Sequence, residues 1–324
     1  MPLTQLNFQP GIDTENTATG AEGKWIDCDK VRFRKGLPQK IGGWTKFSPE
    51  YYVGVGRALE QWYSLTGSRY EALGTDRKVY AYVAGQSQDI TPIRETATLV
   101  NAITTTNTSA TLTISDSAHG ADVGDFVTLS SVSANVGGIL STVLDAEYEI
   151  LTITNVDAYT ILSSATATST VGPTANCTAN YQLNIGPSEQ TFGYGWGSGA
   201  WSASTWGTAR STSNVTIDAR LWSINNWGED LVITQKDGGT YEWDTSGGMS
   251  GNRATVIANA PTTSTLSMIS TETRHVVCMG TETTISSPAT QDKMFIRWSD
   301  QENYNFWTPN VTNSAGSQRI AGGS

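Results

Sequence analysis

The sequence has little of what catalytic and disulfide-linked proteins usually carry. It holds two histidines and three cysteines in 324 residues, and charged residues make up only 15%. With so few histidines and no GxSxG or HExxH pattern, acyl-transfer or zinc-hydrolase chemistry has no residues to use. The cysteines lie far apart and form no CxxC pair, which argues against disulfides or a zinc site and predicts buried free thiols at Cys28, Cys177 and Cys278.

Long apolar runs and helix-forming composition are also missing. No run approaches the ~18–20 apolar residues of a membrane span, and "MPLTQLNFQP" lacks the basic and apolar parts of a signal peptide. These absences predict a soluble chain made in the cytoplasm. Glycine is frequent, at 32 residues, and Ser and Thr together outnumber Ala, Leu, Glu and Lys, which build helices, so we expect an all-β fold of short strands joined by turns.

Positive charge is absent from one long stretch. No Lys or Arg occurs between Arg94 and Arg210, although nine acidic residues do. This stretch is also rich in Thr, Ser, Val and Ile and has strand-like runs, "ATLTIS", "DFVTLSS", "EYEILTIT" and "AYTILSS", between the turn clusters "HGADVG" and "ANVGG". We therefore predict an inserted small β-barrel or sandwich over 95–185, with the main domain formed by 1–94 and 186–324.

The main domain contains a repeat. The segments 70–83, 229–244 and 274–300 each read as an apolar strand, a polar turn and a second strand, and the turn of the third is extended by a loop. A period near 45 residues, once the insertion is removed, is typical of propeller blades. Three such units predict an incomplete propeller. Either its ring closes in an unusual way, or the chain is a fragment of a longer protein, which the uncapped ending "SQRIAGGS" favours.

Three segments resemble the tail nozzle proteins of short-tailed bacteriophages, also called tail tubular or packaged DNA stabilisation proteins. They are "FQPGIDTENTATGAEGKWIDCDKVRFRKGLPQKIGGW", "GYGWGSGAWSASTWGT" and "MFIRWSDQENYNFWTP". The resemblance covers both flanks of the chain and omits the insertion. It implies a propeller-like virion protein, assembled in the host cytoplasm, that forms a ring of six subunits under the portal and its adaptor.

The same resemblance implies a structural function without catalysis or cofactor. Such a ring extends the portal channel, helps to retain and eject the genome, and carries attachment surfaces for tail fibres or spikes. Double-stranded DNA passes through without specific binding, and a pI near 4.7 suits a wall past which DNA slides. The alternatives from other classes are a carbohydrate-binding propeller and a glycosidase, for which no pair of carboxylates can be nominated.

Tryptophans recur every five residues in a glycine-rich segment, a period that fits neither a helix nor a strand. We interpret them as structural pegs that hold a loose loop on the core, with an exposed platform for sugar rings as the alternative. The predicted pegs are Trp196, Trp201 and Trp206, together with Trp298 and Trp307 of the third family-like segment.

Basic residues gather near the N-terminus, at Lys24, Lys30, Arg32, Arg34, Lys35, Lys40 and Lys46. In "KVRFRKG", strand alternation predicts Arg32 and Arg34 on one face and Val31 and Phe33 on the other. This basic strand is a candidate contact with an acidic neighbouring subunit or with passing DNA, for which we nominate Arg32, Arg34 and Lys35. The alternative is the solvated face of an edge strand.

Three other polar clusters have simpler interpretations. The acids and His119 in "SDSAHGADVGD" could pass for metal ligands, but Gly120 and Gly124 favour a tight turn. "TQKDGGT" lacks the GK[ST] ending of a phosphate loop and predicts a hairpin tip. The carboxylates of "NWGED" and "RWSDQEN" are expected to be solvated or to cap turns. We therefore assign no catalytic, cofactor-binding or metal-binding residue.

Overall fold

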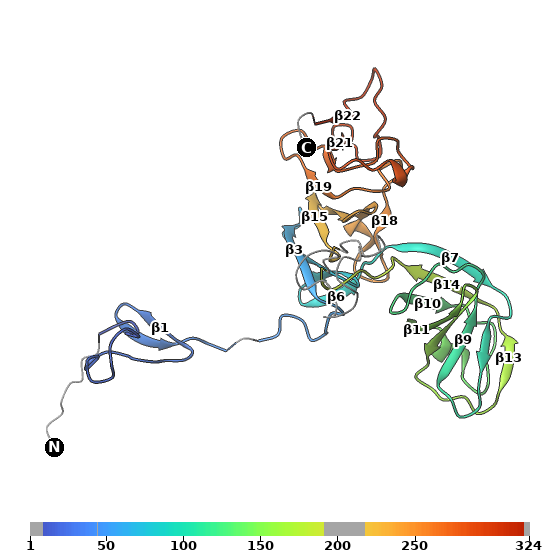
Figure 1. Ribbon diagram of the computed structural model, residues 1–324, viewed down its shortest axis with the longest axis horizontal. Helices are drawn as coiled ribbons and strands as arrows, with labels where there is room; N and C mark the ends of the chain where they lie inside the picture. Colours follow the sequence, from blue (N-terminus) through green and yellow to red (C-terminus); the bar gives the residue numbers. More distant parts are fainter. Residues whose placement is uncertain (1–8, 44, 191–217, 321–324) are drawn as a thin grey trace, which may run out of the picture. The chain divides into compact units, whose positions relative to one another are not determined.

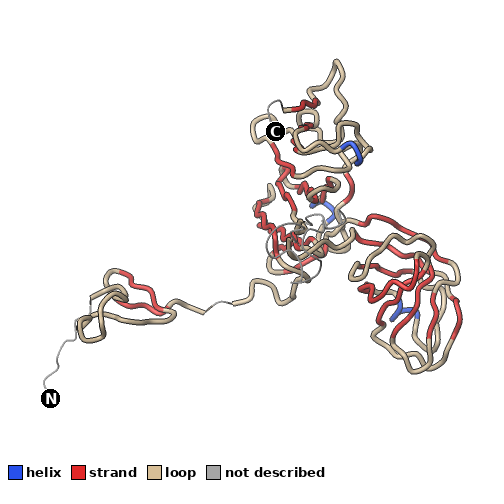
Figure 2. The backbone as a smooth tube through the Cα atoms, in the orientation of Figure 1, coloured by secondary structure: helices blue, strands red, loops and turns tan. Residues whose placement is uncertain are grey.

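The computed structural model describes residues 9–43, 45–190 and 218–320, and the chain divides into two compact units, 1–49 and 50–324. Strands far outweigh helices, as Figure 2 shows, and the predicted all-β fold class is confirmed. The described helical segments are short: α1 (Ser141–Leu144) and the 3-10 turns η1 (Thr245–Gly247) and η2 (Pro288–Thr290). None of these helices approaches the length or apolarity needed to cross a bilayer.

The described part of the first unit contains one hairpin, formed by β1 (Val31–Arg34) and β2 (Leu37–Lys40). Its two central turn residues, Lys35 and Gly36, have φ angles of 52° and 80°. Positive φ at both positions is the type I′ geometry that matches the twist of two-residue hairpins. Glycine adopts it freely, whereas Lys35 is strained by roughly 1 kcal/mol.

Three antiparallel four-stranded sheets form the blades of the second unit (Figure 1). In each blade the strands pair in chain order, and the predicted repeat segments supply the second and third strands. The repeat is thus confirmed as a set of sheets. Blade 1 comprises β3 (Gly56–Tyr63), β4 (Arg69–Thr75), β5 (Val79–Val83) and β6 (Gln86–Asp89); blade 2 comprises β15 (Trp222–Trp227), β16 (Asp230–Gln235), β17 (Thr240–Trp243) and β18 (Thr255–Val256); blade 3 comprises β19 (Leu266–Ile269), β20 (Val276–Met279), β21 (Phe295–Trp298) and β22 (Gly316–Arg319).

Blades 1 and 2 pack face to face around buried tryptophans. Trp62 of blade 1 and Trp243 of blade 2 lie edge to face with ring centroids 6.3 Å apart, a favoured arrangement for aromatic pairs. Trp222 packs on Gly74, where a Cβ atom would come within 2.8 Å of the indole. Glycine at this position therefore allows the close approach of the two sheets.

Blades 2 and 3 enclose a second core. Val232 of blade 2 and Val276 and Cys278 of blade 3 are buried together with Trp307. The first strands of the blades, β3, β15 and β19, lie side by side (Figure 1), as the innermost strands of a propeller do. The sequence prediction of blade-like sheets is therefore matched both in strand order and in stacking.

The insertion folds as one eight-stranded antiparallel sheet over Ile93–Gln182, in the order β13-β8-β9-β12-β11-β10-β14-β7. Two register shifts occur in the β11–β12 pairing, and strands on both sides of β11 contribute to one buried core. The strands are β7 (Ile93–Leu99), β8 (Ile103–Thr105), β9 (Thr111–Ser115), β10 (Phe126–Ser130), β11 (Glu147–Asn155), β12 (Ala158–Leu162), β13 (Val171–Thr174) and β14 (Cys177–Gln182).

The barrel alternative for the insertion is wrong, because in the described chain this sheet ends in two edge strands, β13 and β7. Pro173 offers one physical reason, since proline cannot donate to a neighbouring strand and is confined to sheet edges. The predicted free thiols are buried at Cys177 and Cys278, but Cys28 is only half-buried, so that part of the prediction is wrong.

The division of the chain at 95–185 remains a prediction that deletion can test. The core of the insertion is built from its own residues, whereas the blades have separate cores. We expect a chain in which a short Gly/Ser linker replaces 95–185 to retain cooperative thermal unfolding, because the closure entropy of loops grows slowly with length. Calorimetry measures this, and a broad, non-cooperative transition would mean that the insertion belongs to the main core.

Candidate functional site

The nominated basic residues lie on the β1–β2 hairpin. Arg32 and Arg34 are exposed and Val31 and Phe33 are half-buried, so the predicted alternation of β1 is confirmed. The Arg32 Nε donates to the Gln39 side chain at 3.1 Å, which holds the guanidinium along the opposite strand. Lys35 is at the tip of the turn. The three nominated cations are therefore carried together at one end of the hairpin.

Other residues of the basic cluster make separate contacts. Lys24 pairs with Asp13 at 2.7 Å, and Lys30 lies 3.8 Å from Asp29, a pair that is almost fully exposed. Exposed pairs of this kind contribute little stability. Lys40 lies across from Val31 in the register of the hairpin. Basic residues that lie close together in the sequence therefore form a continuous basic surface only in part.

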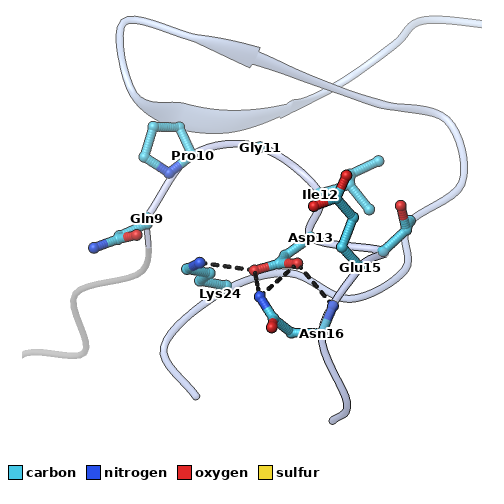
Figure 3. A pocket seen from close by; sticks show the side chains of 9 residues that line it. Gln9, Pro10, Gly11, Ile12, Asp13, Glu15, Asn16 and Lys24 are labelled. Carbon is cyan, nitrogen blue, oxygen red and sulfur yellow. Dashed lines mark hydrogen bonds and ion pairs between the residues drawn. The ribbon is translucent and has the colours of Figure 1, made fainter. Parts of the chain in front are cut away.

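A hollow of about 460 Å³ lies beside the Lys24–Asp13 ion pair and is lined by residues 9–16 and Lys24 (Figure 3). Asp13 accepts hydrogen bonds from Lys24 and from both the backbone and side chain of Asn16. The Lys24 ammonium, followed by the Asn16 amide, lowers the pKa of Asp13 well below its ordinary value. Because Lys24 is committed to Asp13, this arrangement closes a turn and leaves no cation of this lining to bind an anion.

The predicted tryptophan pegs have different outcomes. Trp307 is buried between blades 2 and 3 with 1% of its surface exposed, and its Nε1 donates to the Tyr304 carbonyl at 2.5 Å. Trp298 is half-buried on blade 3 and donates to the Ser314 carbonyl at 2.8 Å. Trp196, Trp201 and Trp206 lie outside the described residues. Sequence reasoning did not single out Trp62, Trp222, Trp227 or Trp243, which are buried at the blade contacts.

A charge network around the buried Lys78 joins the insertion to the blades. Lys78 of blade 1, whose side chain is 4% exposed, contacts Asp89 of β6 at 2.9 Å and Glu147 of β11. Arg253 contacts the same two carboxylates at 3.2 Å each. The Lys78 Nζ also lies 4.0 Å from the ring centroid of Phe126, a favourable cation–π distance. We call Lys78, Asp89, Glu147 and Arg253 the junction network.

A second ion pair reinforces the same junction. Arg77 contacts Glu149 at 2.6 Å and also donates to the Gly124 carbonyl. The cations come from outside the stretch that lacks Lys and Arg, and the two carboxylates of β11, Glu147 and Glu149, come from within it. The uneven charge of the sequence was therefore a usable signal for this contact, although we interpreted it only as a domain boundary.

The turn interpretation of "SDSAHGADVGD" is confirmed. Asp125 is buried and accepts from the backbone of Asp122 and of Ile185. The His119 Nδ1 accepts from the Ala121 backbone at 3.1 Å, and its Nε2 lies 3.3 Å from the Asn155 carbonyl. Both ring nitrogens therefore have backbone partners, one within the turn and one at the end of β11. "TQKDGGT" likewise forms the predicted hairpin tip between β16 and β17, with Asp237 at a φ of 55°.

The clustered carboxylates cap turns, as expected. Asp230 accepts from the backbone and hydroxyl of Thr245. Asp300 accepts from Ser314 and Gln301, and these bonds, with the Ser314 backbone first, lower its pKa. A general acid of a glycosidase requires a raised pKa. The hydrogen bonds to Asp300 therefore make this carboxyl unsuited to the role of a general acid.

Comparisons with known proteins add little at this level of similarity. No protein-family profile matches the sequence, and no curated protein matches it significantly. Among solved structures, the chain is similar to the phage phi92 endosialidase, with 14% identity and a TM-score of 0.24 over 88% of this chain and 40% of that chain. The match thus spans less than half of the endosialidase chain. A likeness this distant establishes neither family nor activity, and the resemblance to tail nozzle proteins stays without independent support.

Proposed function

We propose that this chain is a structural component of a bacteriophage tail nozzle, in which a ring of subunits extends the portal channel. The observation that carries the proposal is the small buried core of the first unit. Of its described apolar residues, Ala21 alone is buried. The described residues of this unit, 9–43 and 45–49, bury too little apolar surface to supply the few kcal/mol that a folded domain needs. The unit therefore requires a surface beyond itself, as an assembly arm does.

Apolar side chains of the first unit are available for such a contact. Ile12, Ile26 and Ile41 are each close to half exposed, and Leu37 is 70% exposed. Leu37 lies directly across from Arg34 on the hairpin, so apolar and basic groups share one face. That combination is suited to a partner surface that is partly apolar and acidic.

Charge supports a neighbouring copy or the portal adaptor as that partner. Residues 1–49 hold seven Lys and Arg against five Asp and Glu, whereas the rest of the chain holds 13 against 25. A basic arm that meets an acidic body on the next subunit makes a head-to-tail contact, which closes into a ring when the rotation is right. The resemblance suggests six subunits.

The acidic body is compatible with a conduit for DNA. A channel that gripped phosphates would slow the passage of the genome, because each phosphate contact adds salt-dependent affinity. In this proposal the DNA passes without specific binding, the chain resides in the virion tail after assembly in the host cytoplasm, and fibres or spikes attach to its outer surfaces.

Charge reversal tests the proposal. We expect Arg32→Glu/Arg34→Glu to weaken ring formation or docking on the adaptor at least about tenfold at low salt and to leave the thermal unfolding unchanged, because rim charges steer association without supporting the fold. Native mass spectrometry and imaging of assembled tails measure it.

Lys30→Glu, a reversal in the same unit ahead of β1, is the matched control and should assemble normally. Normal rings at normal occupancy with the double variant would contradict the proposed contact. A monomer that binds a glycan array would instead favour the carbohydrate-binding alternative.

A further inference from the structure

One face of the β1–β2 hairpin is open and carries both basic and apolar groups. Arg32, Arg34 and Leu37 share this face, because Leu37 lies directly across from Arg34 and side chains alternate along a strand. All three are exposed. On the opposite face, Phe33 packs against Trp25 with ring centroids 6.2 Å apart. That face contacts its own unit, so the open face is the side of the hairpin that a partner can reach.

The negative charge that attracts such a face is concentrated on the insertion. The second unit, residues 50–324, holds 13 Lys and Arg against 25 Asp and Glu, a net charge of −12. Nine of these acidic residues lie between Arg94 and Arg210, where there is no Lys or Arg, and eight of the nine fall within 95–185. The rest of the second unit holds 13 cations against 16 acids, a net charge of −3. A basic surface is therefore attracted mainly to the insertion.

Ion pairs neutralise only part of this charge. In the described chain, the acidic residues of 95–185 that form an ion pair are Glu95, Glu147 and Glu149. The other five acids of this range form none there: Asp116, Asp122, Asp125, Asp145 and Asp157. Of these, Asp125 is buried and Asp145 lies in a separate loop, where it accepts from the Val132 backbone. Three aspartates therefore remain to be placed.

Two turns bring these three aspartates to one corner of the insertion. The Asp116 backbone donates to the Asp157 carbonyl at 2.9 Å, which joins the turn after β9 to the turn between β11 and β12. In the same turn as Asp122, the His119 Nε2 lies 3.3 Å from the Asn155 carbonyl. We call the surface formed by Asp116, Asp122 and Asp157 the acidic corner.

The acidic corner also exposes apolar side chains, since Val123 is 57% and Val156 is 67% exposed. We propose that the open face of the hairpin of one copy docks on the acidic corner of a second copy. Arg32 and Arg34 then face the aspartates, and Leu37 contacts the exposed valines. Opposite charges steer and orient such a contact, and buried apolar surface adds affinity. The inference rests on the proposed function, in which a basic arm meets an acidic body, and it names the surface that the arm contacts.

This contact is head-to-tail, because each copy offers one hairpin and one acidic corner that are different surfaces. A variant that loses the hairpin side keeps its corner, and a variant that loses the corner keeps its hairpin. A mixture of the two variants can therefore form one contact and then stop.

Native mass spectrometry of two variants of the full chain, apart and mixed, tests the inference. Arg32→Glu/Arg34→Glu removes the hairpin side, and Asp122→Arg/Val156→Arg removes the corner side. Asp122 and Val156 are exposed, so the corner variant should fold. We expect each variant alone to associate at least about tenfold more weakly than the wild type at low salt. The equimolar mixture should form a 1:1 pair of twice the 34.7 kDa chain mass.

Glu272→Arg/Val311→Arg is the matched control. It makes the same two exchanges of residue type at exposed positions of blade 3 and should associate like the wild type. Combining the hairpin and corner substitutions in one chain places Glu opposite Arg again and should recover association relative to either variant alone.

The outcomes separate this inference from the proposed function. A corner variant that associates like the wild type, or a mixture without the 1:1 pair, would overturn the inference and leave the basic arm of the proposed function in place. A wild type that stays monomeric at low salt would also overturn it, with the adaptor left as the partner of the arm. Loss of duplex DNA binding by the hairpin variant, with normal association of both variants, would assign the hairpin to DNA instead.

Discussion

Replacing Trp307 by alanine is expected to lower the free energy of unfolding of the blades by about 3–5 kcal/mol. The indole is buried between blades 2 and 3, against Val276 and Cys278. Removing it leaves a large cavity that two stacked sheets cannot close without losing their own contacts, because protein interiors are close-packed. Denaturant unfolding followed by circular dichroism measures the change.

Trp307→Phe is the matched control. It keeps an aromatic ring in the same space and loses mainly the hydrogen bond from Nε1 to the Tyr304 carbonyl. We expect it to cost about 1–3 kcal/mol, clearly less than the alanine variant. An alanine variant that unfolds like the wild type would show that blades 2 and 3 are not held together at this tryptophan.

The second large effect is expected for Lys78→Met. The variant leaves Asp89 and Glu147 close together with Arg253 as their remaining cation in the junction network. Removing one partner of a buried ion pair leaves the opposite charges without compensation. We therefore expect the free energy of unfolding to fall by about 3–5 kcal/mol at neutral pH.

The pH dependence of that loss follows from Asp89. Burial alone would raise the pKa of this carboxyl, but the charges of Lys78 and Arg253, with hydrogen bonds from Thr91 and Lys78, lower it below its ordinary value. A lowered folded pKa contributes stability that is present above the unfolded pKa and is lost as the pH falls through the folded one. The difference between wild type and Lys78→Met should therefore shrink below about pH 4.

Lys293→Met is the control for this experiment. Lys293 pairs with Asp237 in the same unit, but the side chains are 59% and 38% exposed. An exposed pair is worth about 0–1 kcal/mol, and its loss should be small at any pH. Equal effects of the two substitutions would mean that the junction network does not hold the insertion on the blades.

Sequence periodicity was sufficient for the strands that carry strong patterns. The four strand-like runs of the insertion correspond to β9, β10, β11 and β12, and the repeat segments correspond to the central strands of each blade. These strands bury β-branched or aromatic residues on at least one face, which is what the pattern detects.

Strands without such a pattern escaped prediction. β14 reads "CTANYQ" and β13 reads "VGPT", and neither has the β-branched alternation typical of a strand. Their strand conformation is imposed by pairing with β7, β8 and β10, which is a tertiary effect. The junction network was also out of reach, because Arg253 lies 106 residues from Glu147 along the chain. No local spacing connects them.

The three thiols described above differ in their chemistry toward alkylating reagents. Burial raises the pKa of both Cys177 and Cys278 to about 11, so roughly one in 10⁴ of either is a thiolate at neutral pH. Cys28 is the thiol that solvent reaches, and it lies in the first unit, three residues before β1. A maleimide dye added to the unmodified, folded chain should therefore attach at Cys28, which places a fluorescent label on the first unit.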